Sequence, residues 1–115
     1  MTNPAKRKGD KAELEVQTIL RDLLGVPARR ALGAGRTDDI GDIHGIPDTV
    51  IQVANYADIG RALREKVDPC ADQQARAGAL FGATFIRRPG GRYLVAMTPH
   101  QFATLWREAT ATVTT

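Results

Sequence analysis

The sequence has a single cysteine and no long apolar run, and each shortage excludes a class of protein. Cys70 has no second cysteine with which to form an internal disulfide, and one cysteine cannot build a cysteine-rich zinc site. A small secreted protein held together by disulfides is therefore excluded, and a reducing, cytoplasmic location is expected. No stretch approaches the roughly 18–20 apolar residues of a membrane span, and the polar, basic start of the chain lacks the apolar centre of a secretory signal.

The length and composition are those of one modest globular domain. The 115 residues are 43% hydrophobic and 25% charged, which is enough for a single core. No repeat, linker or low-complexity segment divides the sequence, so we expect one domain over residues 1–115. Within it, residues 1–7 are predicted to form a flexible basic arm and residues 110–115 a frayed tail.

Charge is distributed unevenly along the chain. Sixteen basic residues against 13 acidic ones give a net charge of +3, but no basic residue lies between Thr37 and Gly60. That segment contains Asp38, Asp39, Asp42, Asp48 and Asp58. One interpretation is a solvated surface with uneven charge. The other is an acidic metal site flanked by phosphate-binding residues, a combination that nucleic-acid enzymes need.

Hydrophobic periodicity predicts a mixed α/β domain with a central sheet. Helices are expected over residues 8–24, 58–67 and 68–81 and from residue 98 onward, where Thr98 and Gln101 form a capping box. Strands are expected over residues 26–32, 39–46, 49–54, 84–88 and 92–97, the last two joined by a turn with two glycines. Asp68-Pro69 is interpreted as the start of a new helix, so the predicted order is αβββα(broken)ββα.

The strand over residues 49–54 suggests where a site lies. Side chains alternate along a strand, so Ile51 and Val53 are expected in the core and Gln52 on the opposite, open face. Asp42 can reach that face across a tight turn, and Glu13 on the first helix can lean over the sheet edge. Three oxygen ligands in one place suit Mg²⁺. The alternative is that all three are ordinary surface or turn residues.

Three short motifs occur in an order and spacing that resemble a known nuclease family. They are Lys6-Arg7-Lys8-Gly9 followed by Ala12-Glu13, then Asp39-Ile40-Gly41-Asp42-Ile43, and then Ile51-Gln52-Val53-Ala54-Asn55. The chain resembles the archaeal-type and phage Holliday junction resolvases of the PD-(D/E)XK superfamily, from about Lys6 through the last helix. The resemblance implies a restriction-endonuclease-like mixed sheet flanked by helices.

The same resemblance implies a metal-dependent active site. Glu13, Asp42 and Gln52 match the family's acidic and amide positions, and Val53 would offer its backbone carbonyl to the metal. The implied cofactor is Mg²⁺, for which Mn²⁺ can substitute. Ala54 departs from the pattern, because it stands where the family has a lysine that orients or deprotonates the attacking water. Natural degeneration and deliberate replacement of that lysine both remain open.

The implied substrate is a four-way DNA junction, cut symmetrically by a homodimer. The residues expected to contact DNA phosphates are Lys6, Arg7, Lys8, Arg29, Arg30 and Arg36. No nucleotide cofactor is expected, because Gly33-Ala34-Gly35-Arg36 is too short for a P-loop and no Lys-Ser or Lys-Thr follows it. No membrane partner is expected either. The alternative function is a non-catalytic DNA-binding protein on a degenerate form of the same fold.

Overall fold

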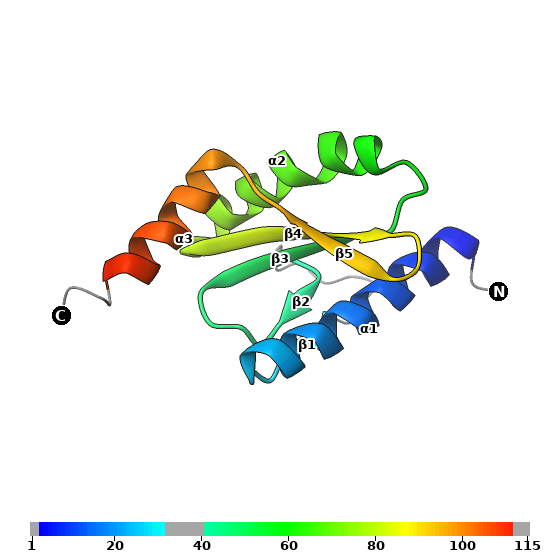
Figure 1. Cartoon of the computed structure of the whole chain (residues 1–115), viewed down its shortest axis with the longest axis horizontal. Helices are drawn as coiled ribbons and strands as arrows, with labels where there is room; N and C mark the ends of the chain where they lie inside the picture. The colour runs from blue at the N-terminus through cyan, green and yellow to red at the C-terminus, as the bar shows by residue number, and fades with distance from the viewer. Residues whose placement is uncertain (1–2, 32–40, 112–115) are drawn as a thin grey trace.

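The structure is a computed structural model that describes residues 3–31 and 41–111. Within these ranges the order of elements is αβββαββα. The elements are α1 (Pro4–Leu24), β1 (Arg29–Arg30), β2 (Ile43–His44), β3 (Thr49–Ala54), α2 (Ile59–Ala77), β4 (Phe81–Arg88), β5 (Arg92–Ala96) and α3 (Pro99–Ala111). Figure 1 shows α3 at the opposite end of the molecule from the start of α1. No helix among the described residues is both long enough and apolar enough to cross a membrane.

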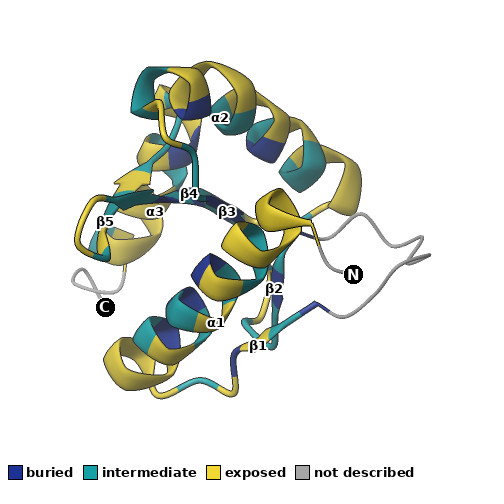
Figure 2. Ribbon diagram, turned by 90° about the vertical axis from the view of Figure 1, so that its right-hand side faces the viewer, coloured by how far each residue is buried: buried dark blue, intermediate teal, exposed yellow. Residues whose placement is uncertain are grey.

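The strands form one mixed sheet in the order β1-β2-β3-β4-β5. β3 and β4 run parallel, and the other neighbouring strands run antiparallel. Parallel neighbours need a long crossover connection, which α2 provides. Figure 2 shows α1 and α2 on opposite sides of the sheet. The predicted class, a mixed α/β domain with a central sheet, is therefore confirmed.

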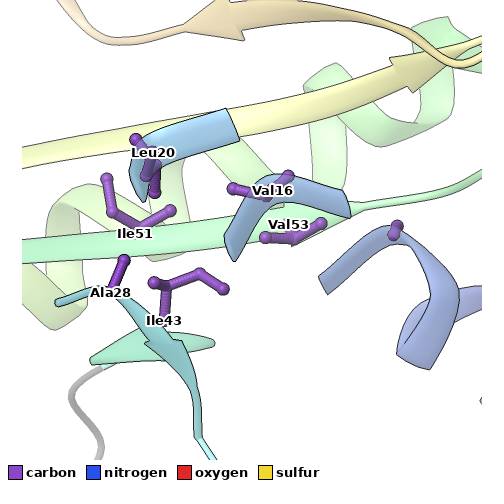
Figure 3. Packing of buried hydrophobic residues seen from close by; sticks show 7 residues of the cluster. Val16, Leu20, Ala28, Ile43, Ile51 and Val53 are labelled. Carbon is purple, nitrogen blue, oxygen red and sulfur yellow. The ribbon is translucent and has the colours of Figure 1, made fainter. Parts of the chain in front are cut away.

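An apolar stripe on α1 covers one face of the sheet. Its buried residues recur at the spacing of one helix face and pack against β2 and β3 (Figure 3). The buried cluster contains Ala12, Val16, Leu20, Ala28, Ile43, Ile51 and Val53. Leu23 lies in the last turn of α1 and is 76% exposed. The core on this face therefore ends one turn before the helix does.

The first helix begins earlier than the sequence pattern predicts. The Asn3 side chain accepts the Lys6 backbone N–H at 2.7 Å, and Pro4 occupies the first turn, where a missing N–H is tolerated. Lys6 also pairs with Asp10 one turn later. Residues 4–7, which were expected in a flexible arm, therefore belong to α1. Gly25 ends the helix with a φ of 67°, as the sequence predicts.

α2 is one continuous helix, where the sequence predicted two. Asp58 caps its start, and Gly78, with a φ of 65°, ends it. Pro69 lies inside the helix, so the predicted break is wrong. Burial explains the difference, because Ala62 and Cys70 are both fully buried and lie eight residues apart on one side of a regular helix. A break between them would remove one of them from the core.

The C-terminal third of the chain follows the prediction with two changes of boundary. Residues 89–91 form the turn between β4 and β5, and Gly90 and Gly91 both have positive φ. Thr98 and Gln101 exchange two hydrogen bonds, of 3.0 and 3.2 Å, so the predicted capping box is confirmed. β4 begins at residue 81, where a helix was predicted to end. α3 continues to residue 111, into the segment that was expected to fray.

Polar contacts join α1 to the β4–β5 hairpin. The Arg87 Nε donates to Glu15 Oε1 at 2.8 Å, and the Tyr93 hydroxyl donates to the same oxygen at 2.6 Å. The Tyr93 hydroxyl also lies 3.3 Å from the carbonyl oxygen of Ala12. Hydrogen bonds from Arg87 are the main reason that the pKa of Glu15 lies below its ordinary value. The first helix is thus held against strands from the far end of the sequence.

Candidate metal and nucleic-acid site

Asp42 lies in a β-bulge beside β3. Ile43 is the register partner of Ile51, and the Asp42 backbone N–H donates to the carbonyl of that same Ile51 at 2.7 Å. Asp42, directly before β2, and Ile43, its first residue, thus both face Ile51, which is the pattern of a bulge. Gly41 precedes it with a φ of 94°, and a Cβ there would lie 2.7 Å from the Ile51 carbonyl oxygen. Only glycine fits at this position.

The bulge directs the Asp42 carboxylate toward the end of β3. Its Oδ2 accepts the backbone N–H of Val53 at 2.8 Å. Glu13 reaches the same place from α1, and the two carboxylates line one cavity of about 560 Å³ at the carboxyl end of β3. We name it the acidic cavity, after Glu13 and Asp42. The structure therefore brings together two of the predicted site residues from separate elements, with Val53 between them.

The electrostatics of the acidic cavity centre on Glu13. Burial raises the pKa of its carboxyl group, and the negative charge of Asp42 raises it further. Arg30 acts in the opposite sense, because its Nη2 donates to Glu13 Oε1 at 3.1 Å while also pairing with Asp10. The pKa of Glu13 still lies above its ordinary value. Additional positive charge in the cavity would therefore stabilise the ionised site.

Gln52 does not join the two carboxylates. Its side chain is buried on the opposite face of the sheet, where its amide donates to the side chain of Gln73 in α2. In an unbulged hairpin, Asp42 would sit opposite Gln52 and share its face. The bulge displaces Asp42 by one position and turns its side chain to the α1 face. The predicted cluster of three oxygen ligands is therefore reduced to two carboxylates among the described residues.

Ala54 lies on the same face of the sheet as Gln52, and its side chain packs against α2 and β4. It is 2% exposed and belongs to a small buried cluster with Ala62 of α2 and Ile86 of β4. Small side chains at positions 54 and 62 let the helix lie close to the strand. The position at which the resemblance implies a lysine is thus occupied by the contact between β3 and α2.

The acidic cavity offers oxygen ligands suited to a hard cation. Mg²⁺ is usually held by one or two carboxylates together with waters and substrate phosphates, and Glu13 and Asp42 supply two carboxylates. Val53 was expected to contribute a carbonyl, and its observed contact is the N–H that orients Asp42. Over residues 3–31 and 41–111, no three His, Cys, Asp or Glu side chains gather as a metal site. The donors therefore fit a partly hydrated Mg²⁺ or Mn²⁺ ion.

The basic residues predicted to contact DNA fall into two groups. Lys6 and Arg30 form ion pairs with Asp10, so their charge is balanced within the protein. The exposed members, which make no ion pair within the described ranges, are Arg7, Lys8 and Arg29. Of these three, Lys8 lines the acidic cavity. Arg36 lies outside the described residues.

A second hollow adjoins the acidic cavity and was not foreseen as a site. It has a volume of about 310 Å³ and shares a wall formed by Lys8, Asn55, Tyr56 and Ala57. We name it the basic groove, after Lys8, Lys11, Arg87 and Arg88, which line it. The three-residue spacing of the lysines on a helix was a usable signal, because such residues share a face. Nothing in the sequence pattern, however, places them beside an arginine doublet near the end of a distant strand.

Comparison of the chain with protein-family models, curated proteins and solved structures gives no match. The likeness to resolvases therefore rests on the three short motifs. Two of their residues, Glu13 and Asp42, meet in the structure, and one, Gln52, points elsewhere.

Proposed function

We propose that this protein binds branched DNA and acts on it as a metal-dependent, structure-selective endonuclease of the Holliday junction resolvase type. The observation that carries the proposal is the convergence of Glu13 and Asp42 on one cavity that adjoins a basic groove. Phosphodiester hydrolysis needs both parts, because carboxylates hold the divalent cation and basic side chains hold the nucleic-acid backbone. The three resolvase-like motifs support the same assignment.

The residues of the acidic cavity take distinct roles in this proposal. Glu13 and Asp42 would hold Mg²⁺ or Mn²⁺, which would polarise the phosphate and activate a water. Val53 fixes the orientation of the Asp42 carboxylate through its backbone N–H. Arg30 positions Glu13 through their 3.1 Å hydrogen bond. The shape of the junction, rather than its base edges, determines which DNA binds, because backbone contacts carry no sequence information.

The position at which the resemblance implies a lysine holds Ala54, which packs against α2 and does not line the acidic cavity. A positive group near the attacking water stabilises the charge that develops in the transition state, and alanine supplies none. We therefore expect the protein to bind metal and junction DNA and to cleave slowly. A second candidate, favoured by the same Ala54, is a DNA-binding protein that has lost catalysis altogether.

A cleavage and binding experiment separates these candidates. A labelled four-way junction and a linear duplex of matched sequence are incubated with the protein in Mg²⁺, Mn²⁺ or EDTA. The variants are Glu13→Gln and Asp42→Asn, and Asp22→Asn is the control, because Asp22 is an exposed α1 residue that lines neither hollow. We expect Mn²⁺ affinity, measured by calorimetry, to fall by about 10-fold or more in both site variants and to be retained in the control.

The outcomes are distinct. Metal-dependent cuts in the junction that vanish in both site variants support the endonuclease. Tight junction binding without any cut, even after long incubation, supports the non-catalytic protein. Equal affinity for junction and duplex at matched salt would refute the resolvase assignment for either candidate.

A further inference from the structure

The basic groove concentrates positive charge from two parts of the chain. Lys8 and Lys11 come from α1, and Arg87 and Arg88 from the end of β4. No acidic side chain among the described residues lines the groove. Glu15 lies beside it and pairs with Arg87, so the four cations and this one carboxylate leave a charge of +3. The groove is therefore suited to a polyanion.

Three of these cations form no ion pair among the residues that the structure describes, although the charge of Glu15 also acts on Lys11. Lys8 and Lys11 are exposed and form no ion pair within the described ranges. Arg88 is half-buried, and its Nε–H is buried without a hydrogen-bond acceptor in that part of the structure. A buried donor without an acceptor is unfavourable, and an anionic oxygen bound in the groove would relieve it. Arg88 thus indicates a ligand independently of the net charge.

The walls of the groove are held in place by the protein itself. The Asn55 side chain donates to the Lys8 backbone carbonyl at 3.0 Å, which fixes the first turns of α1 against the end of β3. On the opposite wall, Arg87 is held by its 2.8 Å hydrogen bond to Glu15. A site that is already formed loses less entropy when a ligand binds.

We propose that the basic groove binds the backbone phosphates that neighbour the phosphate held at the acidic cavity, on the same nucleic-acid strand. This inference rests on the proposed function. It identifies the binding track, which is the path that the bound DNA strand follows over the protein surface. The two hollows share a wall, so a strand that places one phosphate beside Glu13 and Asp42 passes directly into the groove. Lys11 and Arg88 then add to the DNA-binding residues expected from the sequence, of which Lys8 lines the groove.

Salt-dependent binding tests this track without relying on cleavage. Fluorescence anisotropy measures the affinity for a labelled four-way junction in EDTA over a series of KCl concentrations. The test variant is Lys11→Ala/Arg88→Ala, and the control is Arg92→Ala/Arg107→Ala, which removes the same charge from exposed positions outside both hollows. Lys8→Ala/Lys11→Ala is a second test variant at exposed helix positions, in case the loss of Arg88 disturbs folding.

We expect both test variants to bind at least about 10-fold more weakly and to lose about 2 from the log–log salt slope, because each phosphate contact contributes about 0.9. The control should keep the wild-type slope. Equal weakening in test and control variants would overturn the groove, and so would wild-type affinity in the test variants. The groove would also be refuted if the same substitutions abolished binding to phosphatidylserine vesicles, because it would then be a general anion surface.

Different measurements test the proposals for the basic groove and for the acidic cavity, so one can be refuted without the other. If Glu13→Gln and Asp42→Asn leave metal binding unchanged while the groove variants lose DNA affinity, the groove stands and the proposed catalytic site falls. If metal binding depends on the two carboxylates while the groove variants bind DNA normally, the groove falls and the site stands. A wild-type protein without any DNA affinity would refute both.

Discussion

Glu13 is a residue whose ionised form is unfavourable in the folded protein. Burial and the neighbouring Asp42 raise its pKa above the ordinary value of 4.5. A carboxyl group with a raised folded-state pKa contributes stability at low pH, and that contribution is lost as the pH rises through the folded-state pKa. At neutral pH, the metal-free protein therefore carries a destabilising charge at its candidate site, as expected where function and stability conflict.

Replacing Glu13 tests this conflict directly. Without divalent metal at pH 7, we expect Glu13→Gln to unfold at a higher temperature than the wild type, because the amide is neutral and can still accept from Arg30. The difference should shrink as the pH is lowered toward the ordinary carboxyl pKa of 4.5, because the raised folded-state pKa lies above it. Scanning calorimetry measures it, with Asp22→Asn as the charge-matched control. A lower unfolding temperature for Glu13→Gln at pH 7 would show that the Arg30 ion pair outweighs the repulsion.

Gly41 provides a second test at the residue scale. We expect Gly41→Ala to lower the free energy of unfolding by about 3 kcal/mol, because it combines a positive φ with a collision against Ile51. Gly90→Ala is the matched control: φ is 86° and nothing lies within 4 Å of the added methyl, so only about 1 kcal/mol of backbone strain is expected. Urea denaturation measures both. Equal losses would mean that the bulge relaxes around the methyl group.

The sequence predicted that Glu13 and Asp42 come together, but it did not predict the face of the sheet on which they meet. Glu13 and Asp42 were chosen from a motif, and the structure does bring them together. Gln52 was placed with them by assuming a regular hairpin, and the bulge removes that regularity. A one-residue shift between strands reverses faces and leaves almost no trace in the hydrophobic pattern. The positive φ of Gly41 accompanies the bulge, but a glycine before a strand is common in regular hairpins and turns as well.

At the scale of elements, α2 shows that a local sequence signal can also fail to predict where a helix begins. Asp68-Pro69 is a sound signal for a helix start, and it failed because burial of Ala62 and Cys70 favours one continuous helix. Tertiary packing thus outweighed a local preference. The order and class of the elements were predictable, because long amphipathic segments carry their own periodicity. Boundaries at residues 4–7, 77–81 and 110–111 were not, because caps and pairing partners decide them.

The proline inside α2 gives an element-scale prediction. A proline in a helix interior removes one hydrogen bond and crowds the carbonyl four residues earlier, at a cost of about 3 kcal/mol relative to alanine. We expect Pro69→Ala to stabilise the protein by about 1–2 kcal/mol, since part of that gain is offset by greater freedom of the unfolded chain. Thermal unfolding measures it, with Asp68→Ala as the neighbouring control. A lower unfolding temperature would mean that the proline shapes α2 for its packing.

The contact between β3 and α2 gives a second prediction at the scale of elements. We expect Ala54→Lys to destabilise the protein by about 2 kcal/mol or more, because a long charged side chain must enter a site that is 2% exposed. Ala57→Lys, at an exposed position, is the control and should unfold near the wild-type temperature. A stable Ala54→Lys protein with faster junction cleavage would contradict this expectation. It would show that a lysine at 54 reaches the acidic cavity.

At the scale of the whole molecule, apolar side chains gather at the end away from the acidic cavity. Phe102, Leu105 and Trp106 on α3 are 57%, 45% and 58% exposed, at the spacing of one helix face. Leu105 also borders an apolar hollow of about 260 Å³ that Leu24 and Val95 line. A ridge and a hollow on the same surface can fit a second copy of that surface. A homodimer would also provide the two sites that symmetric cutting of a junction requires.

We therefore expect a dimer that Trp106→Glu converts to a monomer, because the introduced charge would be buried between the copies. Arg107→Ala, on the next residue of α3, should leave the dimer intact. Sedimentation velocity at micromolar concentration measures all three proteins, with and without junction DNA. A wild-type protein that is monomeric in both conditions would refute the dimer.

The contacts of Glu15 with Arg87 and Tyr93 have a consequence for the time at which the protein becomes able to bind. The ribosome makes α1 first, but the partners that hold it follow 72 and 78 residues later. Both walls of the basic groove exist only when β4 has been made and docked, and such distant pairings form late in folding. We expect a ribosome-bound nascent chain that ends before residue 81 not to bind nucleic acid, including its own mRNA. The protein would then gain its nucleic-acid binding only when its synthesis is complete.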